Sequence, residues 1–204
     1  MKLIAKISWV ILLTSAILTS FGQYKWKLSK DKDGIKIYVS ENPRSKFKSI
    51  KVECTFPGTF DKLIAVLTDV SHLKDWVYNT KTSYLIKKIT PYDLYYYTET
   101  SIPWPMSNRD AVVHLKIIKD TSQSFVKVSS TSENRLVPEK EGKVRIVYSL
   151  VNWYVTMPTT KTISIIYTFE ADPGGSLPAW LANSFADKAP FESFKKLSEM
   201  LKKR

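Results

Sequence analysis

The chain has 204 residues, of which 44% are apolar, and 31 Lys and Arg against 19 Asp and Glu give a net charge of +12. This length predicts one domain with at most a short appendage, and the apolar content excludes a disordered or collagen-like chain. One Cys and two His exclude an internal disulfide framework, a cysteine-based zinc ribbon and an iron–sulfur cluster held by this chain alone.

The first 22 residues have the layout of a secretory signal peptide. A basic start precedes a mostly apolar run over residues 7–18, and the small residues Ser20 and Gly22 follow it. A membrane anchor is the alternative, but the run is shorter than the roughly 20 residues that span a bilayer. We therefore expect cleavage after Gly22, export to the periplasm or the medium, and a single domain over residues 23–204.

The first part of this domain combines strand and helix patterns. Residues 31–34 (DKDG) indicate a hairpin turn. Residues 47–56 alternate apolar with polar side chains and place Cys54 on the apolar side, which predicts a strand with a buried thiol. Thr59 is expected to cap a helix of about ten residues, and Ser71 a second, shorter helix.

From residue 84 onward the pattern has a period of two. It predicts six consecutive strands, over residues 84–89, 92–102, 109–119, 124–132, 143–155 and 161–171. Because short turns join them, we expect an antiparallel meander.

The chain ends in a helical pattern. Residues 172–175 (DPGG) stop the last strand, and residues 177–204 carry apolar side chains at helical spacing, with Pro190 expected to kink the helix. A curved antiparallel sheet of about nine strands around one long C-terminal helix is an α+β arrangement. Such a sheet encloses more space than its side chains fill, which predicts a ligand cavity.

Four motifs identify a resemblance. Residues 102–110 (IPWPMSNRD) resemble the PWP-x-x-x-RD segment of START (StAR-related lipid transfer) domains. Three further matches follow the family's order: Trp26 with DGIKIY over residues 33–38, Asp69 with Trp76, and DPGG over residues 172–175 with Pro178 and Trp180.

The resemblance implies a helix-grip (START/Bet v 1-like) fold around one lipid-sized tunnel. It also implies that the C-terminal helix is a lid, that residues 102–109 form a gate, and that the protein binds or transfers one lipid without catalysis. Sterol-binding members often have a buried Arg where this chain has Leu115, so a sterol hydroxyl would lack that partner. The family also occurs mainly inside cells, whereas this chain is expected to be exported.

Strand alternation and helical spacing select the candidate ligand-binding residues. They are Tyr96, Val113, Leu115, Ile165, Tyr167, Trp180, Leu181 and Phe185. Pro103, Trp104 and Pro105 are expected to form a gate or a membrane contact, since indoles favour the headgroup region. The alternative is that Trp104 packs against the C-terminal helix as part of the core.

Neighbouring residues on the predicted strands point to opposite faces. Arg109 and Asp110 are expected to anchor the loop structurally through ion pairs or hydrogen bonds, and contact of Arg109 with a lipid phosphate is the alternative. Alternation sends Tyr96 to one face and Tyr95 and Tyr97 to the other. Ordinary sheet packing is therefore expected instead of one aromatic cage for a quaternary ammonium group.

We expect no catalytic residues, cofactor or metal, because the sequence lacks G-x-S-x-G, H-E-x-x-H and phosphate-binding glycine motifs. A basic cluster near the C-terminus either complements the helix dipole or attracts an anionic membrane surface. It consists of Lys195, Lys196, Lys202, Lys203 and Arg204. We expect a monomer that does not bind nucleic acid.

The hypothesis is thus a carrier that binds one hydrophobic ligand, a lipid, in an internal tunnel and transfers it between membranes. Two alternatives remain open at this point. One is a cyclase-like or hydratase-like cavity enzyme acting on an aromatic or polyketide-like small molecule. The other is an interaction module with a fully packed interior.

Overall fold

The computed structural model describes residues 24–42, 45–120, 122 and 124–203. The expected signal peptide lies outside these residues. Ten strands are formed: β1 (Lys27–Lys32), β2 (Ile35–Asn42), β3 (Ser45–Pro57), β4 (Thr80–Thr90), β5 (Asp93–Thr100), β6 (Asn108–Asp120), β7 (Phe125–Ser132), β8 (Lys143–Arg145), β9 (Tyr148–Thr159) and β10 (Thr162–Asp172). The helices are α1 (Phe60–Thr68), the 3-10 turn η1 (Val70–His72), α2 (Leu73–Trp76), α3 (Ala179–Ser184) and α4 (Lys188–Lys203).

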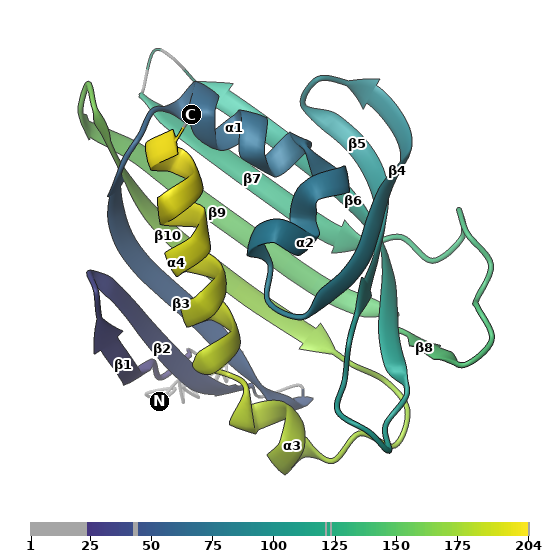
Figure 1. Ribbon diagram of the computed structural model, residues 1–204. Helices are drawn as coiled ribbons and strands as arrows, with labels where there is room; N and C mark the ends of the chain where they lie inside the picture. Colours follow the sequence, from purple (N-terminus) through teal and green to yellow (C-terminus); the bar gives the residue numbers. More distant parts are fainter. Residues whose placement is uncertain (1–23, 43–44, 121, 123, 204) are drawn as a thin grey trace, which may run out of the picture.

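The strands form one curved, mostly antiparallel sheet with the order β1-β2-β3-β10-β9-β7-β6-β5-β4, and α4 lies along its concave face (Figure 1). This confirms the α+β arrangement of a curved sheet around a C-terminal helix. The single strand expected over residues 143–155 is two strands. The first, β8, pairs with β6 in parallel. Directly after β8, the Ile146 amide donates to the Asp110 carbonyl, and the chain then continues into β9.

The core lies between α4, α1 and the concave face. Leu197 and Leu201 of α4 and Leu63 of α1 are at most 1% exposed, and each fully buried leucine stabilises the fold by about 1.5–3 kcal/mol. No helix among the described residues is long and apolar enough to cross a membrane.

Three features of the first part of the domain agree with the sequence analysis: the cap of α1, the β1–β2 turn and the buried cysteine. Thr59 caps α1 as expected, its hydroxyl accepting a hydrogen bond from the Lys62 amide at 3.3 Å. The β1–β2 hairpin turns through Asp33 and Gly34, both with positive φ, which is the two-residue turn typical of tight hairpins. Cys54 is buried without a disulfide partner, and burial raises the pKa of its thiol.

Two helix predictions are wrong in detail. Ser71 lies inside η1, and α2 begins at Leu73 without a side-chain cap. The C-terminal segment is not one kinked helix but two helices, α3 and α4, separated at residues 185–187. Pro190 does not kink a helix interior, because it lies in the first turn of α4, where the backbone N–H groups need no helical partner.

Arg109 joins two segments that are far apart in the sequence. Its guanidinium donates to the carbonyls of Pro173 (2.9 Å) and Gly174 (3.1 Å) after β10, and to that of Ser107 (2.5 Å) before β6. Gly174 has a φ of 64°, and a Cβ there would lie 3.3 Å from the Arg145 carbonyl oxygen. The RD and DPGG motifs are thus two halves of one contact.

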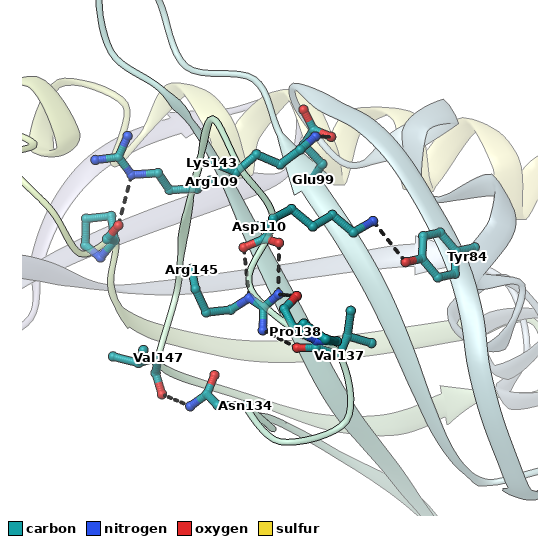
Figure 2. A network of polar contacts seen from close by, with 12 residues as sticks. Tyr84, Glu99, Arg109, Asp110, Asn134, Val137, Pro138, Lys143, Arg145 and Val147 are labelled. Atoms are coloured by element: carbon teal, nitrogen blue, oxygen red, sulfur yellow. Dashed lines mark hydrogen bonds and ion pairs between the residues drawn. The ribbon is translucent and has the colours of Figure 1, made fainter.

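Asp110 points to the opposite face of β6 and forms a buried ion pair. Its carboxylate accepts from Nε and Nη2 of Arg145 at 2.8 and 3.0 Å, and Arg145 also donates to the carbonyls of Val137 and Pro138 (Figure 2). The pair holds the β7–β8 connection against the outer face of the sheet. Arg109 and Asp110 therefore anchor loops, as the sequence predicts.

We predict that Asp110→Asn lowers the free energy of unfolding by about 3–5 kcal/mol, because the Arg145 charge stays buried without its counterion. Urea denaturation of the variant and the parent measures the change. The matched control is Asp31→Asn, whose partner Lys36 lies 3.8 Å away at the surface and which should cost no more than about 1 kcal/mol. Equal losses for the two variants would contradict the role assigned to the Asp110–Arg145 pair.

Candidate functional site

A cavity of about 290 Å³ lies between α2, α4 and the concave face of the sheet. We call it the inner cavity. Its strand wall includes the inward side chains Tyr96, Val113, Leu115, Val128, Val151 and Tyr167. Among the described residues that line it, none is an Asp, Glu, Lys, Arg, His or Cys.

A second cavity of about 230 Å³, the outer cavity, continues the first toward the surface. The two share seven wall residues: Ile50, Tyr78, Thr100, Ile146, Phe169, Ala171 and Ala189. Leu177, Leu181 and Phe185 around α3 cover the outer cavity, and Ile102 and Pro103 of the β5–β6 loop form its rim. Together the two adjoining cavities have the size and apolar character of a small-molecule site.

Three aromatic rings pack together beside the inner cavity. Trp153 stacks on Phe194 at 5.2 Å between ring centroids, and Tyr167 meets both rings edge-on at 4.9 and 5.2 Å. Such pairs add about 0.5–1.5 kcal/mol each beyond their buried area. They hold the wall residue Tyr167 in one orientation.

Tyr96 and Tyr167 bring phenol groups to this apolar wall. Burial raises the pKa of both hydroxyls well above the ordinary tyrosine value, and for Tyr167 the nearby Tyr96 raises it further. Both groups are therefore neutral at physiological pH and able to donate and accept hydrogen bonds.

The short helix α3 covers the outer cavity with few contacts of its own. None of its residues is buried. The side chain of Asn183 ties it to β3 by accepting from the Lys48 amide at 3.0 Å and donating to the Lys46 carbonyl at 3.3 Å. Leu177 and Ala186, which flank α3, are buried. The helix is therefore anchored at both ends, while its own residues remain accessible.

Two indoles stand exposed at this end of the molecule. Trp104, in the β5–β6 loop, is 92% exposed, and Trp180, in α3, is 72% exposed. Trp104 thus does not pack as part of the core. Both segments border the outer cavity, at the lower end of the molecule in Figure 1.

The structure brings most of the expected ligand-binding residues together. Tyr96, Val113, Leu115 and Tyr167 line the inner cavity, and Leu181 and Phe185 line the outer one. The expectations for Ile165 and Trp180 are corrected. Neither residue lines either of the two cavities: Ile165 is fully buried in the core, and Trp180 is exposed to solvent.

Sequence reasoning missed the contribution of α2 and its continuation. Trp76, Val77 and Tyr78 line the inner cavity, as do Trp153 and Phe194. The apolar character of these residues is compatible with a place in the cavity wall. However, no strand or helix period indicated that such a short helix faces the sheet.

The tyrosine-rich strand β5 is arranged as alternation predicts. Tyr96 faces the cavity, whereas Tyr97 stacks on Tyr84 on the outer face with Lys140 above its ring. Tyr95 stacks on His114. The three rings therefore form no common cage.

The last lysines of the chain are not close to the rim of the outer cavity between α3 and the β5–β6 loop, which we call the mouth. The last turn of α4, with Lys202 and Lys203, lies near α1, whereas α3 lies at the other end of α4 (Figure 1). These ends are about 20 Å apart along the helix axis. Arg204 lies outside the described residues. Within the described chain, no cluster of three or more His, Cys, Asp or Glu is arranged to hold a metal ion.

Comparisons with known proteins agree with this geometry. The family model described as "START domain" matches residues 19–204. An uncharacterised protein of Pseudomonas aeruginosa is 30% identical over 179 residues, 88% of each chain, and a bovine phosphatidylcholine transfer protein is 28% identical over 163 residues, 78% of this chain and 75% of the relative. The crystal structure of a STAR-related lipid transfer protein from Xanthomonas axonopodis superposes with a TM-score of 0.79 at 33% identity, covering 87% of this chain and 98% of the other.

We predict that Asn183→Ala loosens α3, because it removes two hydrogen bonds worth about 1 kcal/mol each. Hydrogen–deuterium exchange read by mass spectrometry should be up to roughly thirtyfold faster over residues 177–187 and unchanged in the buried turns of α4. Asn134→Ala, which removes a surface-loop bond to the Val147 carbonyl, is the control and should leave residues 177–187 unaffected. Exchange at the parent rate in Asn183→Ala would show that these bonds do not hold α3.

Proposed function

This chain belongs to the START domain family, and from that premise we propose that it binds one lipid or similarly hydrophobic molecule and carries it between membranes. The observation that supports the proposal most is the pair of adjoining apolar cavities, which share seven wall residues and lie between the concave face of the sheet and α3. Burial of ligand surface there contributes about 25 cal/mol per Å² of apolar area. The bovine relative named a phosphatidylcholine transfer protein fits the same class of activity.

The chemistry of the cavity favours carriage over catalysis. General acid–base catalysis near pH 7 needs a group whose pKa lies near that value. The described residues around the inner cavity offer no carboxylate, imidazole or thiol, and burial moves the pKa of Tyr96 and Tyr167 away from neutrality. We propose that the protein is not an enzyme.

The mouth supports a proposed membrane contact. The exposed indoles of Trp104 and Trp180 have the amphipathic character that places Trp at the headgroup level of a bilayer. Lys46 is exposed on β3, and Lys48 lines the outer cavity, so an anionic surface would add about 1 kcal/mol for each lysine close to it. In this proposal a monomer docks mouth-first, and α3 opens away from the β5–β6 loop to exchange the ligand.

We also propose that the protein works outside the cytoplasm. The support is the sequence pattern of residues 1–22, which favours export with cleavage after Gly22. Amino-terminal sequencing of the protein purified from its host would test the cleavage position.

Native mass spectrometry of the purified protein, followed by organic extraction, tests carriage directly. The proposal predicts a stoichiometric bound lipid, either as purified or after incubation with mixed liposomes. A protein that stays empty after both treatments would contradict it.

We predict that Leu181→Arg reduces lipid uptake from liposomes at least tenfold, because the guanidinium would have to stay unpaired in the apolar outer cavity. Native mass spectrometry of the liposome-treated variant measures the loaded fraction. Leu136→Arg is the matched control, since Leu136 is 44% exposed on the outer surface. Unchanged uptake by Leu181→Arg, with the fold intact by circular dichroism, would exclude this cavity as the route.

We predict that the double variant Trp104→Ala and Trp180→Ala slows lipid transfer between vesicles tenfold or more. Partial burial of two indoles in the headgroup region is worth several kcal/mol at about 25 cal/mol per Å². A fluorescent-lipid transfer assay measures the rate. The control is Ile118→Ala with Ile166→Ala, a pair of exposed apolar residues on other parts of the sheet. Equal slowing in both double variants would contradict a specific docking role for the indoles.

A further inference from the structure

The described wall of the inner cavity has some polar side chains but no charged ones. Its described wall contains apolar side chains and hydroxyl groups, and no Asp, Glu, Lys, Arg or His. A phosphate or quaternary ammonium group placed there would lose its hydration without gaining a counterion, which is costly. The portion of the ligand that occupies the inner cavity must therefore be uncharged.

The two phenol groups lie at the same depth on facing walls. Strands β5 and β10 run in the same direction and are separated by β9, β7 and β6 across the concave face (Figure 1). Tyr96 precedes Thr100 by four residues, and Tyr167 precedes Ala171 by four. Because Thr100 and Ala171 both border the outer cavity, each tyrosine lies about 13 Å further in.

These hydroxyls have no protein partner. Within the described chain, neither the Tyr96 nor the Tyr167 hydroxyl forms a hydrogen bond, whereas buried polar groups normally have one. Two other hydroxyls of the wall are engaged: Ser193 donates to the Ala189 carbonyl and accepts from the Tyr78 amide, and the hydroxyls of Ser149 and Ser132 bond each other. Within the described chain, the wall hydroxyls of Tyr78, Thr80, Thr98, Thr100 and Ser130 also form no hydrogen bond, but the Thr and Ser side chains are short and stay at the wall, and Tyr78 borders the outer cavity as well.

We propose that Tyr96 and Tyr167 together bind an uncharged oxygen of the ligand, a hydroxyl or a carbonyl, so that the protein carries a neutral lipid with its polar end inward. The inference rests on the proposed carrier function and narrows its ligand class. Among its described residues, the inner cavity of this chain has no group to balance a phosphocholine, the headgroup of the lipid for which several relatives are named. A phenol hydroxyl can donate to a carbonyl and can donate to or accept from an alcohol, so the pair suits either oxygen.

Two lipids with the same acyl chain test the ligand class. Monooleoylglycerol and oleoyl-lysophosphatidylcholine differ only by the phosphocholine group. Competition against a fluorescent fatty-acyl probe, with each lipid kept monomeric, measures their affinities for the full-length protein. We expect monooleoylglycerol to bind at least roughly tenfold more tightly. Equal or tighter binding of the lysophosphatidylcholine would overturn the inference while leaving lipid carriage intact.

Single phenylalanine variants test the two tyrosines. Tyr96→Phe and Tyr167→Phe keep the ring packing and should each weaken monooleoylglycerol binding about three- to tenfold. They should leave binding of octadecene, which has no oxygen, and the melting temperature unchanged. Tyr154→Phe, on the exposed side of β9, is the control and should have no effect.

The remaining outcomes separate the two proposals. Parent-like binding of monooleoylglycerol by both tyrosine variants would overturn the assigned role of the hydroxyl pair and leave carriage standing. Failure of the parent protein to bind monooleoylglycerol, lysophosphatidylcholine and octadecene alike would overturn the carrier function together with this inference.

Discussion

A sheet of ten strands that curves around one long helix has more concave surface than the helix can cover. The apolar side of α4 fills the end near α1, where Leu197 and Leu201 leave no space. Toward the other end two cavities remain, and the short helix α3 and its flanking residues cover the outer one. The cavities follow from this difference between the area of the concave face and the area of α4, because the side chains of α4 cannot pack closely against the sheet along its whole length.

The mouth combines a rigid frame with a loosely held cover. Three hydrogen bonds from Arg109 join the β5–β6 loop to the turn after β10, and the Asp110–Arg145 pair fixes the outer face behind them. The cover is held by far less: the amide of Asn183 and the flanking residues Leu177 and Ala186. Regions with few buried contacts open at low free-energy cost, so this difference allows exchange without unfolding of the frame.

Charged and neutral polar groups occupy different places in this fold. All the buried charges that anchor the mouth lie on the outer face of the sheet or at the rim, where carbonyls and carboxylates compensate them. The wall of the inner cavity has hydroxyl groups and indoles but, among its described residues, no charged side chain. The rings of Trp153 and Phe194 hold Tyr167, and within the described chain neither its hydroxyl nor that of Tyr96 forms a hydrogen bond. A site with neutral donors can reject a ligand that lacks a matching oxygen and also one that brings an uncompensated charge.

The sequence by itself determined the α+β class, the inward face of each long strand and the two motifs that Arg109 connects. These depend on period and local chemistry, so alternation placed Tyr96, Val113, Leu115 and Tyr167 on the correct side. It could not show that Ile165 lies beyond the cavity, that α2 forms a wall, or that Trp180 points outward. Helical spacing defines a face without its neighbour, and the break at residues 185–187 turns α3 onto a different surface from α4. Only the tertiary structure decided where side chains fill the interior and where space remains, because that depends on distances between segments far apart in the chain.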